Sequence, residues 1–447
     1  MTKVKTKLSE HMTHQVALTV IAKIKQEKME DLKQLLGSIN KDILGNKIIP
    51  FRQFDTVHFA RFVILEESKD LDGNTIQPSL VFSSCIDAPL DKHFNQLVDV
   101  ALDGLDRIYD CCEGYPSVGD RTRQSRLNFL QVHQVKVQAF YVNTIGRTLQ
   151  QINQEAELRD KIEDFLDRQQ AKSFLDWDAS EARRAIQEFV KGETSLSWAQ
   201  FLAARPNLLW QVKEKLHFIF GLVLILTLSL LFLPFSPIFF AILRYKEEQD
   251  AQQDNLRLNT GQPRNELAIR EDHVVQNQFS AVGYIKPGLF RQITVRVLLW
   301  LVNFASRHIF NNGNLAGVDA LNLDGVDTIH FARWIVIDEG RRVLFMSNYD
   351  GSLESYMDDF INKVAWGLNA VFSNGVGYPK TRWLILDGAK DEQAFKAFIR
   401  QHQIVTQVWY PAYSQLTAVN LSNNAQIRAG LFKNLNQQQR SEWLHRL

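Results

Sequence analysis

One phrase occurs twice in this chain of 447 residues. The stretch DTVHFARFVIL (55–65) returns as DTIHFARWIVI (327–337). Three further pairs of segments match, namely 81–116 with 344–379, 17–25 with 278–286, and 133–141 with 402–410. A repeat of this extent predicts a duplicated folding unit of roughly 150 residues per copy.

Both copies show hydrophobic periodicities in the order β-α-β-β-α-β. The first copy predicts strands at 17–25, 58–65, 79–84 and 135–142, with helices at 29–39 and 94–109. The second predicts strands at 278–286, 330–337, 342–347 and 404–410, with helices at 289–310 and 353–372. This order predicts an α+β fold of tandem ferredoxin-like repeats, each with helices on one sheet face. The open faces need a partner, so we expect the repeats to pair as a dimeric α/β-barrel-like unit.

The segment between the repeats is strongly apolar. Residues 216–243 contain no Asp, Glu, Lys or Arg, and a bilayer-spanning helix needs about 20 such residues. Pro234 and Pro237 interrupt the segment, and basic residues flank both of its ends. A single crossing would separate the repeats, so we expect a re-entrant or shallow hairpin with both repeats on the cytoplasmic side, the inner membrane in a bacterium. The alternative is one tilted span, with pairing in a homo-oligomer.

The expected organisation has seven parts. They are a polar tail (1–13), repeat 1 (14–165), a helical linker (166–213), the hydrophobic membrane segment (214–246), a polar linker (247–275), repeat 2 (276–432) and a C-terminal tail (433–447). The formal net charge of +1 gives no basic excess for nucleic acid. The helix at 288–310 combines arginines with large apolar residues, which suits either the membrane interface or an ordinary core.

The duplicated phrase places a His and an Arg inside an apolar strand. Strand alternation predicts that His58 and Arg61 lie on opposite faces. A buried Arg needs a carboxylate or a polar cavity, and Asp87 or Asp350 is the expected partner. The alternative is that Arg333 and His330 face a ligand cavity. The ligand-binding candidates are His58, Arg61, His330, Asn348 and Ser352.

The loop SNYDGS (347–352) is the clearest difference between the repeats, since repeat 1 has SCIDAP there. Five polar residues meet at this strand-to-helix junction: Asn348, Tyr349, Asp350, Ser352 and Glu354. A helix N-terminus can bind an anion, whereas an N-cap explains only one or two of the five. We therefore expect the functional site in repeat 2. The polar stretch at 270–280 either lines the mouth of that site or is a solvated linker.

Two ferredoxin-like units, an Arg within a strand and an Asp-Gly pair in the adjoining loop occur together in this sequence. In these features the chain resembles the dye-decolourising peroxidase relatives of the dimeric α/β-barrel superfamily. The family's Gly-x-x-Asp-Gly signature is present only as Tyr349-Asp350-Gly351, without its first Gly. The resemblance implies a haem, with Asp350 as distal acid/base and Arg333 polarising peroxide. The catalytic candidates are therefore Asp350 and Arg333, together with Tyr349 of the same loop. The histidine candidates for the iron ligand are His308, His330 and His402.

The membrane segment adds a lipophilic substrate to this hypothesis. The sequence thus predicts a membrane-associated oxidoreductase that acts on a peroxide or a lipid. The alternative is a non-catalytic module that binds membrane lipid or serves as a scaffold. No HExxH, CxxC, P-loop, GxGxxG or GxSxG motif is present to suggest another chemistry.

Overall fold

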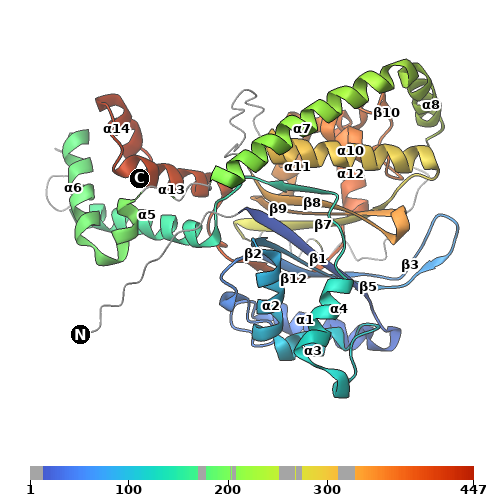
Figure 1. Cartoon of the computed structure of the whole chain (residues 1–447), viewed down its shortest axis with the longest axis horizontal. Helices are drawn as coiled ribbons and strands as arrows, with labels where there is room; N and C mark the ends of the chain where they lie inside the picture. Colours follow the sequence, from blue (N-terminus) through green and yellow to red (C-terminus); the bar gives the residue numbers. More distant parts are fainter. Residues whose placement is uncertain are drawn as a thin grey trace.

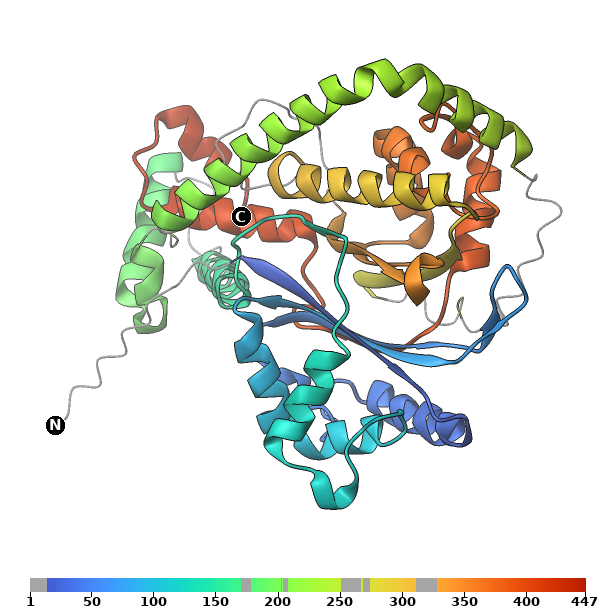
Figure 2. The same ribbon diagram turned by 45° about the vertical axis from the view of Figure 1, so that its right-hand side comes forward.

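Two four-stranded antiparallel sheets lie face to face, with helices on their outer faces (Figure 1). The computed structural model describes residues 14–169, 178–201, 203, 208–250, 267, 274–310 and 328–447. The expected tail (1–13) and most of the polar linker lie outside these residues. A helical bundle lies at one end of the sheets (Figure 2).

The strand orders bring together segments that are far apart in the sequence. The first sheet runs β1 (Gln15–Lys23), β5 (Ser79–Asp87), β2 (Val57–Leu65) and β12 (Thr406–Pro411). The second runs β6 (Ala139–Val142), β8 (Ile329–Ile337), β9 (Arg342–Asp350) and β7 (Gln276–Tyr284). Strands β2 and β5 are buried at every position, which explains why they read as continuous apolar runs.

The last strand of each half joins the sheet of the other half. Strand β12 pairs with β2, and β6 pairs with β8. The segment just before each of them lies beside the first strand of its own half, since Gln134 bridges Val20 and Gln403 bridges Ala281. The chain then crosses from one sheet to the other.

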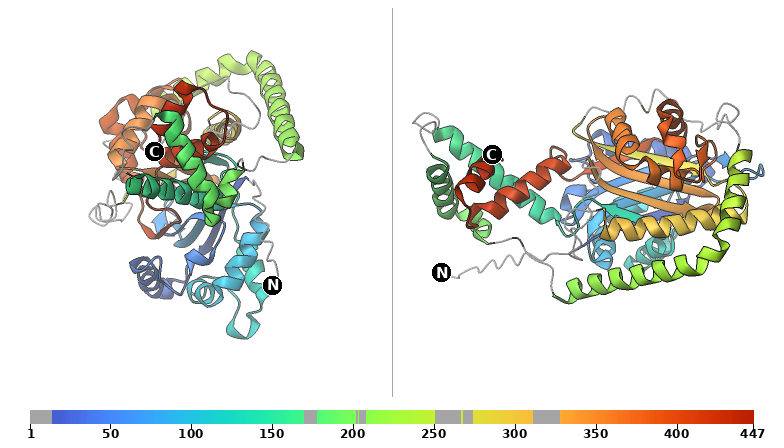
Figure 3. Two further views of the ribbon diagram at one scale, coloured as in Figure 1. Left: turned by 90° about the vertical axis from the view of Figure 1, so that its left-hand side faces the viewer. Right: turned by 90° about the horizontal axis from the view of Figure 1, so that it is seen from above.

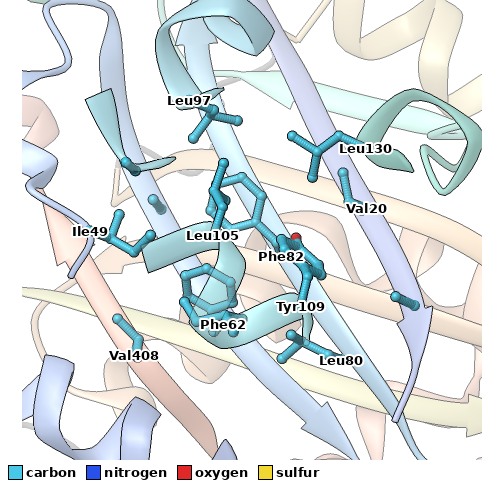
Figure 4. Packing of buried hydrophobic residues seen from close by; sticks show 14 of the residues in the cluster. Val20, Ile49, Phe62, Leu80, Phe82, Leu97, Leu105, Tyr109, Leu130 and Val408 are labelled. Carbon is cyan, nitrogen blue, oxygen red and sulfur yellow. The ribbon is translucent and has the colours of Figure 1, made fainter. Parts of the chain in front are cut away.

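The expectation that 135–142 and 404–410 close their own sheets is therefore wrong. Periodicity shows that a segment is extended and which of its residues share a face, but it does not identify the neighbouring strand. The exchange also changes the core. Val408 of β12 packs among side chains of the first half such as Phe62 and Leu105 (Figure 4).

The helices expected at 29–39, 94–109, 289–310 and 353–372 are present, and each sheet also carries a further helix, at 123–132 or 392–402, that was not expected. Those on the first sheet are α1 (Met29–Lys41), α2 (Leu90–Val100), α3 (Leu102–Tyr109) and α4 (Arg123–Val132). Those on the second are α10 (Leu289–His308), α11 (Leu353–Phe372) and α12 (Glu392–His402). The expected helix at 94–109 is split at Ala101, whose φ of −111° and ψ of 26° are not helical. Just beyond, Gly104 allows close approach, because a Cβ there would collide with the Ile48 carbonyl.

Five helical segments form the bundle at the end of the sheets. They are α5 (Leu149–Gln169), α6 (Ala179–Gly192), η5 (Thr194–Gln200), α13 (Ala418–Leu431) and α14 (Gln437–Leu444). Their shared core includes Leu158, Ile186, Ile427 and Trp443. The expected linker (166–213) and C-terminal tail (433–447) therefore contribute packed helices, because each contains an apolar stripe that the other covers.

The apolar segment forms a bent helical arch, defined as α7 (Leu208–Phe232), η6 (Leu233–Phe235) and α8 (Ser236–Gln249). It runs alongside α10 on the outside of the molecule and turns at η6, which contains Pro234 (Figure 3). Within the described residues it is the one helix long and apolar enough to cross a membrane. Most of its apolar side chains are exposed, including Leu226, Leu230 and Phe235.

Short elements complete the described chain. Two small hairpins are β3 (Ser68–Lys69) with β4 (Thr75–Ile76), and β10 (Thr381–Arg382) with β11 (Leu386–Asp387). The remaining 3-10 turns are η1 (Gln26–Lys28), η2 (Phe51–Gln53), η3 (Val118–Asp120), η8 (Asp338–Gly340) and η9 (Gly388–Lys390).

Candidate functional site

Two buried arginines connect the sheets. Arg61 of β2 donates through Nη1 to the Phe279 carbonyl at 2.8 Å and through Nη2 to the Ser347 carbonyl at 2.9 Å. In the opposite direction, Arg333 of β8 donates to the carbonyls of Leu18 at 2.7 Å and Ser84 at 3.0 Å. Each arginine thus bonds an edge strand of the facing sheet and the strand beside it, β7 and β9 for Arg61 and β1 and β5 for Arg333.

The expected pairing of these arginines with Asp87 and Asp350 is wrong. Further polar atoms around them come from Ser280 and Asn348 beside Arg61, and from Thr19 and Cys85 beside Arg333. Carbonyl, hydroxyl and amide oxygens compensate a buried guanidinium by hydrogen bonding rather than by charge. Burial and the nearby charge of Arg333 lower the pKa of Arg61 to about 9.

The two aspartates pair with histidines instead. His58 Nε2 lies 3.0 Å from Asp87 Oδ1, and His330 Nε2 lies 2.8 Å from Asp350 Oδ1. The second oxygen of each carboxylate accepts the first backbone N–H of a bundle helix. Asp87 accepts from Leu149 of α5 at 2.9 Å, and Asp350 accepts from Ala418 of α13 at 2.7 Å. A carboxylate at a helix N-terminus is favourable, so each His–Asp pair fastens the bundle to a sheet.

A backbone irregularity changes the expected faces of the histidines. The register of β2 against β5 shifts between Val57 and Phe59, and that of β8 shifts between Ile329 and Phe331. A β-bulge breaks strict alternation. Simple alternation predicts that His58 and Arg61 lie on opposite faces of the sheet. Instead, His58 points toward the other sheet as Arg61 does, and its ring centroid lies 5.5 Å from that of Phe331.

Tyr413 lies between the two His–Asp pairs. Its hydroxyl lies 3.2 Å from His58 Nδ1, and its ring lies 5.9 Å from that of His330. Burial, Cys85 and the two carboxylates raise the pKa of the Tyr413 phenol, which keeps it neutral. The adjacent cavity has a volume of about 20 Å³, which is enough for a single water molecule. Sequence reasoning missed Tyr413 because its aligned position in the first half is Thr144.

The polar residues of the SNYDGS loop do not form one site. Ser352 caps α11 by accepting the Ser355 N–H at 3.2 Å. Asn348 binds Arg61, and Tyr349 stacks on Tyr356 with ring centroids 4.2 Å apart in the core of the second half. Glu354 lies 2.5 Å from Lys396 Nζ. An N-cap therefore explains Ser352 at the start of α11. Tyr349 packs in the core and does not form a site with Asp350 and Arg333.

The metal-ligand candidates lie apart from one another. His308 Nε2 lies 2.7 Å from His217 Nδ1, His330 bonds Asp350, and His402 Nδ1 bonds the Phe398 carbonyl at 2.8 Å. The described residues bring one group of carboxylates together, at Glu354, Asp358 and Glu392. The Lys396 ammonium lies within 2.7 Å of all three and forms an ion pair with each of them.

The space between the sheets does not fit a haem. Between Arg61, Cys85, Arg333 and Asn348 the free volume is about 10 Å³, whereas pockets for ligands smaller than a haem begin near about 300 Å³. Asp350 is occupied by His330 and the α13 N-terminus. The side chains that the resemblance assigns to peroxide chemistry thus form a filled, hydrogen-bonded layer.

Both ends of the arch are held on α10. At its beginning, Arg307 donates to both Glu214 oxygens, at 2.9 and 2.5 Å. At its end, Asp250 accepts from Arg291 at 2.9 Å and from Lys286 at 2.5 Å. The packing is also tight, since a Cβ at Gly221 of α7 would collide with the Phe304 ring.

A second contact fixes the end of α8. Glu247 is 1% exposed and accepts the N–H groups of Trp383 at 3.0 Å and Leu384 at 2.8 Å. Both donors have positive φ, 59° and 66°, in the turn between β10 and β11. Such a conformation is strained for residues with a Cβ. Sequence reasoning did not identify Glu214, Glu247 and Asp250 as anchors. Their position as acidic residues beside a long apolar run was the available signal.

Comparisons with known proteins identify no relative of this chain. No family model, no curated protein and no solved structure matches it.

Proposed function

We propose that this chain is a monotopic membrane protein that attaches its α/β body to one face of a bilayer through the arch. The observation that carries the proposal is that both ends of the arch are bonded to the same helix. At about 1.5 Å per residue, the helical path from Glu214 to Asp250 is about 54 Å long, whereas their partners Arg307 and Arg291 lie about 24 Å apart on α10. The arch therefore bows outward, and its ends share one side.

The exposed side chains of the arch supply the contact with lipid. A soluble surface rarely exposes an apolar patch of this extent. The apolar residues continue onto α10 as the exposed Leu289, Ile293 and Val297. Lys213 and Lys246 flank the uncharged part of the arch (216–243) and favour the anionic, cytoplasmic face. A re-entrant or in-plane attachment therefore explains the geometry better than a single crossing does.

We infer further that the two halves are copies of one ferredoxin-like unit, paired as a dimeric α/β-barrel-like body. The strand bridges support this inference. The segment before β6 bridges to β1 and β6 itself pairs with β8, while the segment before β12 bridges to β7 and β12 itself pairs with β2. These connections join the two sheets at both edges. The peroxidase-like activity stays a prediction from the resemblance, and the filled layer between the sheets offers it no site.

Flotation with liposomes tests membrane attachment. The full chain is expected to float with vesicles of neutral and anionic phospholipid. The double variant Leu226→Lys/Leu230→Lys should lose flotation, since a central Lys costs about 2.5–3.5 kcal/mol in a bilayer. The matched control is Leu44→Lys/Leu71→Lys, which changes two exposed leucines away from the arch. Equal flotation of both double variants would contradict the proposal.

Cysteine labelling tests the topology. Variants Lys213→Cys and Lys246→Cys place one thiol on each side of the uncharged part of the arch (216–243), while the native cysteines are buried. In sealed vesicles that carry the protein in one orientation, a membrane-impermeant maleimide should label both flanks or neither. Labelling of only one flank would demonstrate a single crossing and reject the monotopic arrangement.

A further inference from the structure

A large cavity opens where the chain crosses from the first sheet to the second. It has a volume of about 1040 Å³ and lies between the ends of β1, β2 and β8, the crossing segment 133–138 and α10. Its size is at the upper limit of typical ligand pockets. It lies apart from the filled layer of Arg61 and Arg333.

The corresponding place in the other half is used for contact between the halves. There the Tyr284 hydroxyl donates to the Lys69 carbonyl of the β3–β4 hairpin at 2.7 Å. The same hairpin region binds Arg341 through Asp70 at 3.0 Å and Arg342 through Ser68 at 3.1 Å. In the aligned repeats, Lys23 takes the place of Tyr284.

The equivalent connection on the cavity side is only a tight turn. Strands β8 and β9 are joined by Asp338–Gly340 and Arg341 instead of a hairpin. Asp338, Glu339 and Gly340 all have positive φ, at 51°, 57° and 97°. Two consecutive non-Gly residues in this conformation are strained. The turn keeps the connection short, and the cavity stays open beside it.

The charges at the cavity favour an anion. Lys23, Lys136 and Arg296 line it, and none of the three forms a salt bridge among the described residues. Lys23 Nζ donates to the neutral Gln77 amide oxygen at 3.1 Å.

The acidic groups on the lining offset little of this charge. Asp338 is paired with Arg342 at 2.6 Å, and Glu339 lies 3.6 Å from Arg341. Glu113 is the remaining carboxylate on the lining. Within the described part of the chain, the lining therefore carries three cations without a carboxylate partner and one carboxylate, Glu113, without a cationic partner.

The rest of the lining is mostly apolar. It includes Ile21, Leu65, Val135, Trp300, Val336 and Ile337. Arg296 and Trp300 belong to α10, the helix that holds both ends of the arch. An apolar ligand could thus reach the cavity from the membrane surface along α10, with its polar end at the cations.

We propose that this cavity binds a long-chain amphiphile with an anionic head group, a fatty carboxylate or a lysophospholipid phosphate. Arg296 and Lys136 bind the head group, and the apolar lining holds the chain. The route from the membrane rests on the proposed monotopic attachment, whereas the binding itself does not. Charge-assisted hydrogen bonds to carboxylate or phosphate favour this assignment.

Quenching of Trp fluorescence by a spin-labelled stearate measures binding to the full chain in a non-ionic detergent. Unlabelled oleate and lysophosphatidate then compete, and the stronger competitor identifies the head group. Saturable quenching, competition by at least one anion and at least about tenfold weaker competition by oleyl alcohol are expected. Octanoate should compete far more weakly than oleate, since each buried methylene strengthens binding.

The double variant Arg296→Glu/Lys136→Glu should weaken binding at least about tenfold, and Val135→Trp should do so by filling the apolar part. Lys47→Glu, an exposed charge reversal elsewhere, is the matched control. Equal binding by the charge-reversal variant and the control, or by oleate and its alcohol, would overturn the proposal. Melting curves in the same detergent identify any unfolded variant.

The two proposals fail separately. The arch variant Leu226→Lys/Leu230→Lys should lose flotation but retain quenching in detergent. The cavity variants should retain flotation and lose quenching. Loss of flotation alone would leave the cavity site intact, and loss of quenching by the wild type would reject the site and leave the membrane attachment.

Discussion

Arg61 and Arg333 lie in opposite sheets, and each donates hydrogen bonds to backbone carbonyls of the sheet that carries the other. This reciprocal pair accounts for the Arg in the duplicated phrase. Its role is to join the two sheets through their facing, buried sides. The pair and its hydrogen-bond partners fill the space between the centres of the sheets.

Loss of one arginine should destabilise the whole body. Arg61→Met removes the donors for two strand carbonyls and for Asn348, and we expect a loss of about 3–5 kcal/mol in the free energy of unfolding. Urea unfolding in detergent, followed by far-UV circular dichroism, measures this loss. The control Arg52→Met replaces an exposed arginine and should change stability by less than about 0.5 kcal/mol. Similar midpoints for both variants would contradict the bridging role.

Asp350→Asn tests the link between the second sheet and the bundle. The change removes the negative charge that His330 and the N-terminus of α13 share, so we expect a loss of about 1–3 kcal/mol. Amide hydrogen exchange at the beginning of α13 should rise first. Asp103→Asn, at an exposed position of α3, serves as the control. If exchange in α13 stays unchanged, the carboxylate does not hold the helix.

Glu247→Ala should release the end of the arch. It leaves the N–H groups of Trp383 and Leu384 without their acceptor, which costs about 1–3 kcal/mol locally. Limited proteolysis and hydrogen exchange at 381–387 report the release. The neighbouring Glu248→Ala provides a matched control, because that side chain is 64% exposed. Equal protection of the turn in both variants would show that Glu247 is not an anchor.

Stability should fall as the pH drops below about 6.5. Burial lowers the pKa of His93 to about 3, so between these values the unfolded chain binds a proton that the folded chain does not. The free energy of unfolding therefore decreases with falling pH, by up to about 1.4 kcal/mol per pH unit from this residue. Urea midpoints at pH 7 and pH 5 measure the slope. His93→Gln should reduce it, and an unchanged slope would exclude His93 as the cause.

Strong local patterns predicted the elements well. Strands β2 and β5 and helix α11 carry long apolar runs or stripes, and the structure places them within three residues of their expected bounds. Partners between strands were not predictable, because β6 and β12 have equivalent patterns and each fits either sheet. The exchange depends on two crossing segments whose sequence carries no partner information.

The polar residues were harder to place than the elements. His58 changed faces because of a bulge that one extra residue creates, and no turn residue in the sequence signals it. Arg333 found carbonyls in a strand 315 positions away, at Leu18. Asp350, one of the two carboxylates expected to pair with an arginine, binds His330 instead. The partners of these polar side chains depend on how the two sheets pack against each other. The residue pattern within one strand carries no information about that packing.

The exchange of β12 also affects synthesis of the chain. Until residues 406–411 leave the ribosome, strand β2 has an open edge, although the rest of its sheet has been available since residue 87. An unpaired, apolar edge invites pairing with other chains. The nascent protein must carry this exposed edge while more than 300 further residues are made, including the arch. In the proposed monotopic arrangement, early docking of the emerging arch on a membrane would hold the ribosome-bound chain away from its neighbours during that interval.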